Sequence, residues 1–63
     1  MTPREAEVLA GIARGLSNKE IALKLDVSPR TIDNHTSNLF KKIGAQGRTA
    51  AAMYAIEQGI FSF

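Results

Sequence analysis

Six polar side chains recur between residues 30 and 41 at steps that place them along one side of a helix. They are Arg30, Asn34, Ser37 and Lys41, with Asp33 and Asn38 flanking them. Guanidinium and ammonium groups only donate hydrogen bonds, a carboxylate only accepts them, and an amide does both. The chemistry that such a surface supports is recognition through hydrogen bonds and charge, without making or breaking covalent bonds.

Covalent and metal chemistry have little support in this sequence. The chain contains no cysteine and a single histidine, His35. It has no glycine-rich phosphate loop and no combination of nucleophile, base and orienting group. A lone imidazole without cysteine or a second histidine makes a poor metal site. We therefore expect no enzyme activity, no cofactor and no metal site.

The length and composition point to one small folded unit. With 63 residues, 44% of them hydrophobic and 22% charged, the chain can form one domain with one small core. No apolar run approaches the roughly 20 residues of a membrane helix, so no membrane partner is expected. A formal net charge of +2 permits contact with phosphates. The absence of cysteine fits a cytoplasmic protein.

Two helix-start signals lie in the first third of the chain. Residues 2–5 (TPRE) combine an N-cap hydroxyl, a proline at the first helical position and a glutamate three residues after the cap. They predict a helix over residues 3–14. Residues 17–20 (SNKE) repeat the pattern and predict a second helix over residues 18–25.

Two further helices are predicted in the rest of the chain. Ser28 followed by Pro29 opens a third helix over residues 29–43, and Gly44 closes it. A fourth helix is expected over residues 48–58. Its N-terminal flank offers only a weak cap, so this helix depends more on packing.

Each predicted helix has an apolar side that can contribute to a common core. These positions are Val8, Leu9, Ile12 and Ala13 in the first, Ile21, Ala22 and Leu25 in the second, Ile32, Thr36, Leu39, Phe40 and Ile43 in the third, and Ala52, Ala55 and Ile56 in the fourth. No segment shows a strand pattern, a repeat or a linker. We predict an all-α fold, a four-helix bundle with a central helix-turn-helix, in a single domain over residues 1–63.

The second and third predicted helices form the helix-turn-helix. Two helices joined by a short turn brace each other, so that one can enter the major groove of DNA while the other crosses the phosphates. The polar side of the third helix would then face the base edges. We expect the helix over residues 29–43 to be the recognition helix.

Four segments follow one another in a characteristic order. They are residues 2–9 (TPREAEVL), 15–22 (GLSNKEIA), 28–35 (SPRTIDNH), and 41–44 (KKIG) followed by 48–49 (RT). At these spacings they resemble the LuxR-type DNA-binding domain of the NarL/FixJ group of bacterial regulators, over nearly the whole chain. The resemblance implies that the third helix reads the major groove, that the second supports it, and that the fourth often mediates dimerisation on DNA.

The resemblance also implies a biological setting. Such domains usually follow a regulatory domain, so the chain is expected to be the output domain of a response regulator or a stand-alone regulator of minimal size. The expected partner is double-stranded promoter or operator DNA, with RNA polymerase as a further candidate. Two alternatives remain: a helical protein-interaction module that binds an acidic partner, and a promoter-recognition domain of a sigma factor.

Ten residues are candidates for DNA binding. They are Lys19, Lys24, Arg30, Thr31, Asp33, Asn34, His35, Ser37, Asn38 and Lys41. The Asn34 amide can pair with adenine N6 and N7, whereas Arg30 and Lys41 can contact phosphates without choosing a sequence. Lys19 and Lys24 are candidate phosphate anchors, and a solvated helix side is the alternative for both.

Three of these candidates also have structural alternatives. Thr31 can donate to a phosphate or belong to the cap of its own helix. Asp33 stands where many relatives carry lysine. Its carboxylate can accept from cytosine N4, cap a turn of its own helix, or pair with Arg30 or Lys41. For His35, a structural or phosphate-binding role is favoured over a titrating switch.

The fourth predicted helix has more apolar circumference than one core-facing side requires. An exposed apolar patch often marks a partner surface, and we expect a homodimer through this helix. The candidate dimer interface comprises Ala50, Met53, Tyr54 and Glu57. The alternative is that Phe61 and Phe63 fold back over Met53 and Tyr54.

Overall fold

The protein is folded as four helices in the computed structural model, which describes residues 1–61. Helix α1 spans Pro3–Ala13, α2 spans Asn18–Leu25, α3 spans Pro29–Ile43 and α4 spans Arg48–Glu57. No strand occurs among these described residues. The all-α fold is confirmed, and α1 and α4 each end one residue earlier than predicted.

Capping boxes begin α1 and α2, as the sequence predicts. In α1 the Glu5 N–H donates to Thr2 Oγ1 at 3.2 Å, and the Thr2 N–H donates to Glu5 Oε1 at 3.0 Å. In α2 the Glu20 N–H donates to Ser17 Oγ at 3.1 Å, and the Ser17 N–H donates to Glu20 Oε1 at 2.8 Å. These bonds satisfy N–H groups that have no partner within the helix.

The helices α3 and α4 begin differently. Ser28 accepts a hydrogen bond from the Thr31 N–H at 3.2 Å, so α3 has a side-chain cap. Helix α4 follows Gly47 with no side-chain cap bond, and its position depends on packing. In the turn before α3, Asp26 adopts a left-handed conformation with φ 57°, which aspartate tolerates better than most residues do.

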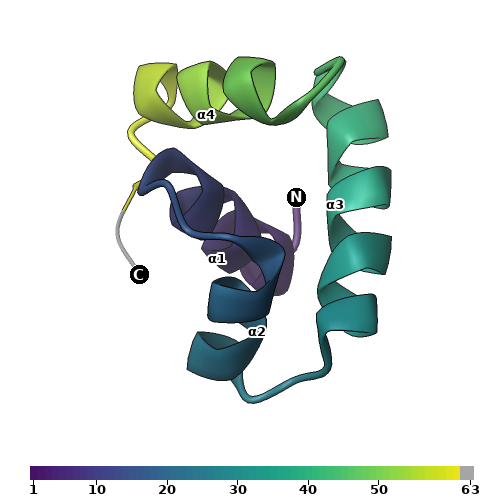
Figure 1. Ribbon diagram of the computed structural model, residues 1–63. Coiled ribbons are helices and arrows are strands. Elements are labelled where there is room, and N and C mark those ends of the chain that lie inside the picture. The colour runs from purple at the N-terminus through teal and green to yellow at the C-terminus, as the bar shows by residue number, and fades with distance from the viewer. Residues whose placement is uncertain (62–63) are drawn as a thin grey trace.

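Helix α1 packs against each of the other three helices (Figure 1). The core beneath them consists of Val8, Leu9, Ile12, Ile21, Ala22, Ile32, Leu39, Ala51 and Ala55. Helix α3 runs along one side of the molecule, where α2 is its main packing partner, and α4 crosses the end of α3 (Figure 1). Within residues 1–61 no helix is both long and apolar enough to cross a membrane.

The predicted core holds for the first three helices and is wrong for part of α4. The buried side of α4 is Ala51 and Ala55. Ala52 is partly buried and packs against the core as predicted, whereas Ile56 is 59% exposed. Because alanine and other apolar residues of α4 lie around most of its circumference, the spacing of apolar residues does not define one inward side. The small side chains of Ala51 and Ala55 form the buried side of α4 instead.

The two bulky residues of α4 lie in different environments. Met53 is 58% exposed, while Tyr54 is partly buried and packs against the core. Phe61 is itself 49% exposed, and the 58% exposure of Met53 shows that most of the Met53 side chain is open to solvent. Phe63, the other aromatic residue expected to cover them, lies outside the described residues.

Candidate nucleic-acid interface

Helix α3 has one buried side and one exposed polar side. Ile32, Thr36 and Leu39 are buried against the rest of the molecule. The exposed residues include Arg30, Asp33, Asn34, Ser37, Asn38 and Lys41. All six polar residues that the sequence aligned along this helix are therefore open to solvent. The exposed edge of α3 can be approached by a large partner without unfolding the domain.

Thr31 and His35 lie beside this polar side and are partly buried. The Thr31 hydroxyl is 2.9 Å from Ser28 Oγ, and the Thr31 N–H donates to that same oxygen. The geometry of Thr31 thus fits its capping alternative. The position of His35 at the margin of the exposed side fits either of its two expected roles.

Lys19 and Lys24 are exposed on α2, away from the buried pair Ile21 and Ala22. Both residues therefore lie at the surface of α2. Leu23, between them on the same helix, is 75% exposed and was not singled out by the sequence. A single exposed leucine is common on protein surfaces and defines no site by itself.

Asp33 has a partner that the sequence analysis did not consider. Its Oδ1 accepts a hydrogen bond from Asn18 Nδ2, at the start of α2, at 2.8 Å. The predicted ion pairs with Arg30 or Lys41 do not form within residues 1–61. The carboxylate is instead bonded to the helix that braces α3.

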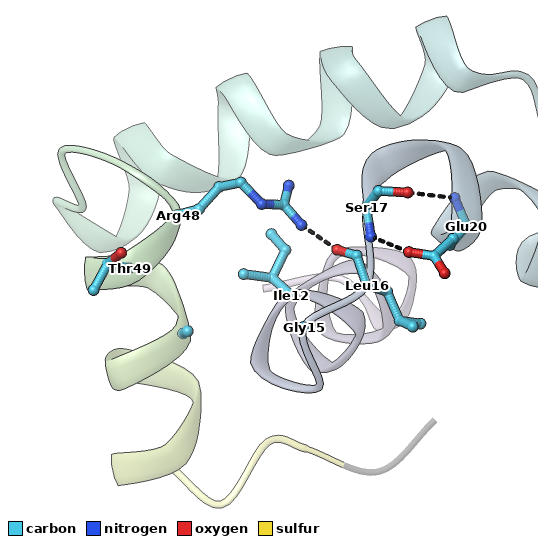
Figure 2. Close-up of a pocket in the computed structure, with 8 residues that line it drawn as sticks. Ile12, Gly15, Leu16, Ser17, Glu20, Arg48 and Thr49 are labelled. Atoms are coloured by element: carbon cyan, nitrogen blue, oxygen red, sulfur yellow. Dashed lines mark hydrogen bonds between the residues drawn. The ribbon is translucent and has the colours of Figure 1, made fainter.

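Arg48 is a second residue whose role the sequence analysis did not identify. From the start of α4, its Nη1 donates to Asn18 Oδ1 at 2.6 Å, and its Nη2 donates to the carbonyl oxygen of Leu16 (Figure 2). The one available signal was its position. A cation in the first turn of a helix lies at the positive end of the helix dipole, which is an unfavourable position.

Arg48 also borders an open hollow of about 320 Å³ between the α1–α2 turn and the start of α4 (Figure 2). The other lining residues are Ile12, Gly15, Leu16, Ser17, Glu20, Thr49 and Ala52. Ser17 and Glu20 are bonded to each other in their capping box. The guanidinium of Arg48 is bonded across the hollow to the Leu16 carbonyl oxygen, so this side chain ties the start of α4 to the α1–α2 turn.

Lys42 lies close to α1 and has a structural partner there. Its Nζ is 3.0 Å from Glu5 Oε1, and this contact ties the end of α3 to the start of α1. The Thr2 backbone N–H, and next the Lys42 ammonium, lower the pKa of the Glu5 carboxyl from 4.5 to about 2. The Ser17 backbone N–H likewise lowers the pKa of Glu20. Lys42 therefore contributes to the framework beneath the polar side of α3.

The arrangement of α2, the turn and α3 defines a helix-turn-helix domain. A family profile described as "Bacterial regulatory proteins, luxR family" matches residues 1–55. The chain therefore belongs to the LuxR family of bacterial regulatory proteins. This is a family of transcription regulators, not a class of enzymes, and LuxR-type regulators bind DNA.

Several bacterial regulators are similar to this chain. The transcriptional regulatory protein LnrK of Bacillus subtilis is 46% identical over 63 residues, which cover 100% of this chain and 29% of LnrK. The response regulator Rre1 of Synechocystis is 42% identical over 59 residues, covering 94% of this chain and 26% of Rre1. The response regulator protein VraR of Staphylococcus aureus is 40% identical over 60 residues, covering 95% of this chain and 29% of VraR. The chain thus spans less than a third of these relatives.

Proposed function

We propose that this chain binds specific double-stranded DNA as the output domain of a bacterial transcription regulator, with α3 as the recognition helix in the major groove. The observation that carries the proposal is the exposed polar side of α3. It extends from Arg30 to Lys41 and lies opposite the buried side of the same helix. Helices α1 and α2 pack against α3 and hold it in place.

The exposed residues suggest a division of roles. Asn34, near the middle of the polar side, is suited to a bidentate contact with adenine, and Ser37 and Asn38 can bond bases or phosphates. Arg30 and Lys41 extend from its two ends and supply positive charge for the phosphates.

The remaining candidates surround this central part. Lys19 and Lys24 of α2 would contact the DNA backbone beside the groove, and Thr31 and His35 would contact it from the margin of α3. Asp33 would accept from cytosine N4. The site thus combines base contacts in the middle with backbone contacts around them.

We further propose that α4 joins two copies into a homodimer. Its solvent side contains Ala50, Met53 and Glu57, and Ile56 extends the apolar part of this surface. Tyr54 packs partly against its own core and would contribute only its outer edge. A two-fold dimer would place two copies of α3 on successive major grooves.

The longer relatives suggest the context of this domain. A regulatory domain preceding it in a full-length response regulator would control DNA binding, and bound RNA polymerase is a candidate partner at the promoter. Because a bacterial transcription regulator acts where the chromosome lies, the proposed location is the cytoplasm.

A selection from random DNA duplexes, followed by titrations at several salt concentrations, tests the proposed function. We expect one sequence to be enriched and to compete better than unrelated duplexes. We also expect log K to fall linearly with log salt concentration. No affinity for any duplex at low salt would overturn the proposal. Binding to duplexes and acidic polypeptides alike, without sequence preference, would favour a protein-interaction module.

A further inference from the structure

Three side chains from three helices form a connected polar chain. Arg48 at the start of α4 donates to Asn18 Oδ1 at 2.6 Å, and Asn18 Nδ2 at the start of α2 donates to Asp33 Oδ1 at 2.8 Å. Asp33 lies on the exposed side of α3. A residue of the recognition helix is thus bonded to α4 through one amide of α2.

The direction of these bonds follows from the groups themselves. A guanidinium has no acceptor, so the oxygen of the Asn18 amide must face Arg48. The NH₂ group then faces Asp33, whose ionised carboxylate can only accept. Arg48 is also held by the Leu16 carbonyl oxygen, which fixes the guanidinium end of the chain (Figure 2). Each member therefore constrains the next.

We propose that Asn18 and Arg48 are positioning residues that hold the Asp33 carboxylate in place, and that Asp33, held in this way, selects the base pair that it faces. This inference rests on the proposed function. It extends the specificity-determining unit beyond α3 to two residues that need not touch the DNA. The carboxylate has one oxygen, Oδ1, committed to Asn18, and no hydrogen bond to Oδ2 is found within residues 1–61.

The second carboxylate oxygen determines the ligand chemistry. A carboxylate oxygen in the major groove can accept from the N4 amine of cytosine. If guanine stood in place of that cytosine, its N7 and O6 acceptors would repel the carboxylate. Because Oδ1 is restrained, Oδ2 can reach only a limited region of the groove. The favoured ligand at this position is a C·G pair with cytosine on the strand nearer to Asp33.

A lysine at position 33 could not accept the hydrogen bond that Asn18 Nδ2 donates to Asp33. Its ammonium would meet the NH₂ group of Asn18, a donor facing a donor, with the Arg48 cation just beyond. The bonded chain therefore requires an acceptor at position 33. The acidic residue and its two supports act together, and the effects of changing them should not be independent.

Duplex-binding measurements with a panel of single-base-pair variants of the selected sequence test this inference. We expect Asp33→Ala to reduce the preference at one base pair by about tenfold, the range of a single base contact. Asn18→Ala should reduce the preference at that same base pair by about threefold, because a hydrogen bond at the surface only biases the carboxylate. When Asn18→Ala is combined with Asp33→Ala, it should cause no further loss of preference at that base pair.

Two other variants separate positioning from a general structural role. Asn18→Asp keeps an acceptor for Arg48 but removes the donor to Asp33, so it should reduce the same preference even if Asn18→Ala is poorly folded. Lys19→Ala, at the adjacent position of α2, should weaken all duplexes alike and leave the preference at every base pair unchanged.

The inference is overturned if Asn18→Ala and Asn18→Asp leave the preference at the Asp33 position intact, or if the Asn18 and Asp33 effects multiply independently. Either outcome leaves the proposed function standing, because the native chain would still select a sequence. If the native chain itself shows no sequence preference, the proposed function fails together with the inference.

Discussion

The charged residues of this chain differ in what they contact. Lys42 and Arg48 are basic, yet both are bonded to groups of other helices within the domain. Arg30 and Lys41 are exposed on α3 and have no hydrogen bond or ion pair within residues 1–61. At the scale of single residues, some basic side chains near the helix-turn-helix bind other helices of the domain, and others remain exposed. Only the exposed ones are suited to contact DNA.

Asn34→Ala and Lys41→Ala should affect DNA binding in different ways. Asn34→Ala should cost about 1–3 kcal/mol at one base position and relax preference there, because a bidentate base contact is lost. Lys41→Ala should weaken all duplexes alike and reduce the salt slope by about 1, because a phosphate contact is lost. Titrations against the selected duplex and its variants at several salt concentrations measure both effects. Equal effects of the two substitutions on every duplex would contradict the proposed division.

Glu5 should make the domain sensitive to acid. Its folded-state pKa of about 2 lies below the ordinary 4.5, so the stability it contributes is fully present above pH 4.5. This contribution should be lost as the pH falls from 4.5 towards 2. Denaturation midpoints measured across this range should fall less steeply for Glu5→Gln than for the native chain.

A matched variant identifies the partner that lowers this pKa. Lys42→Met removes the ammonium but keeps the Thr2 backbone N–H, the larger cause of the shift. The Glu5 pKa should therefore rise only part of the way to its ordinary value, which a carboxyl titration by NMR can measure. A Glu5 carboxyl that titrates near 4.5 in the native chain would refute the argument.

At the scale of the helix, the start of α3 depends on its cap. Ser28→Ala removes the acceptor of the Thr31 N–H and should lower the free energy of unfolding by about 1 kcal/mol. Ser37→Ala is the matched control, because Ser37 is exposed in the middle of the same helix. It should have little effect or stabilise slightly, since alanine is the better helix former. Equal losses in chemical denaturation would show that the cap is not the cause.

Helix α4 differs from α3 in how its orientation is determined. Helix α3 has a capped start and a clear apolar side, so its rotation is evident from its own residues. Helix α4 has no side-chain cap and is alanine-rich. Its rotation depends on which alanines fit against α1, its main packing partner.

At the scale of the whole molecule, the outer side of α4 is available to a second copy. Because Met53 is 58% exposed, Met53→Asp should leave the monomer folded and abolish dimerisation on DNA. Circular dichroism and sedimentation of the protein bound to a duplex with two half-sites measure the two properties. Gln46→Asp, in the exposed loop before α4, controls for the added charge and should leave the dimer intact.

Two results would argue against this interface. If Met53→Asp unfolds the monomer, the Met53 side chain belongs to the packing of the monomer itself and not to an interface. If Met53→Asp still dimerises on the duplex, another surface joins the two copies. Neither result bears on the proposed role of α3 in the native chain, since its polar residues lie on a different helix.

The sequence by itself determined the four helices, most of the core and the polar side of α3. Caps at Thr2, Ser17 and Ser28 and the spacing of apolar residues act over a few residues, so local order in the sequence is enough to identify them. The tertiary structure alone decided the rotation of α4 and the partner of Asp33. The Arg48, Asn18 and Asp33 side chains are far apart in sequence. Only the packing of three helices brings their donors and acceptors within hydrogen-bonding distance.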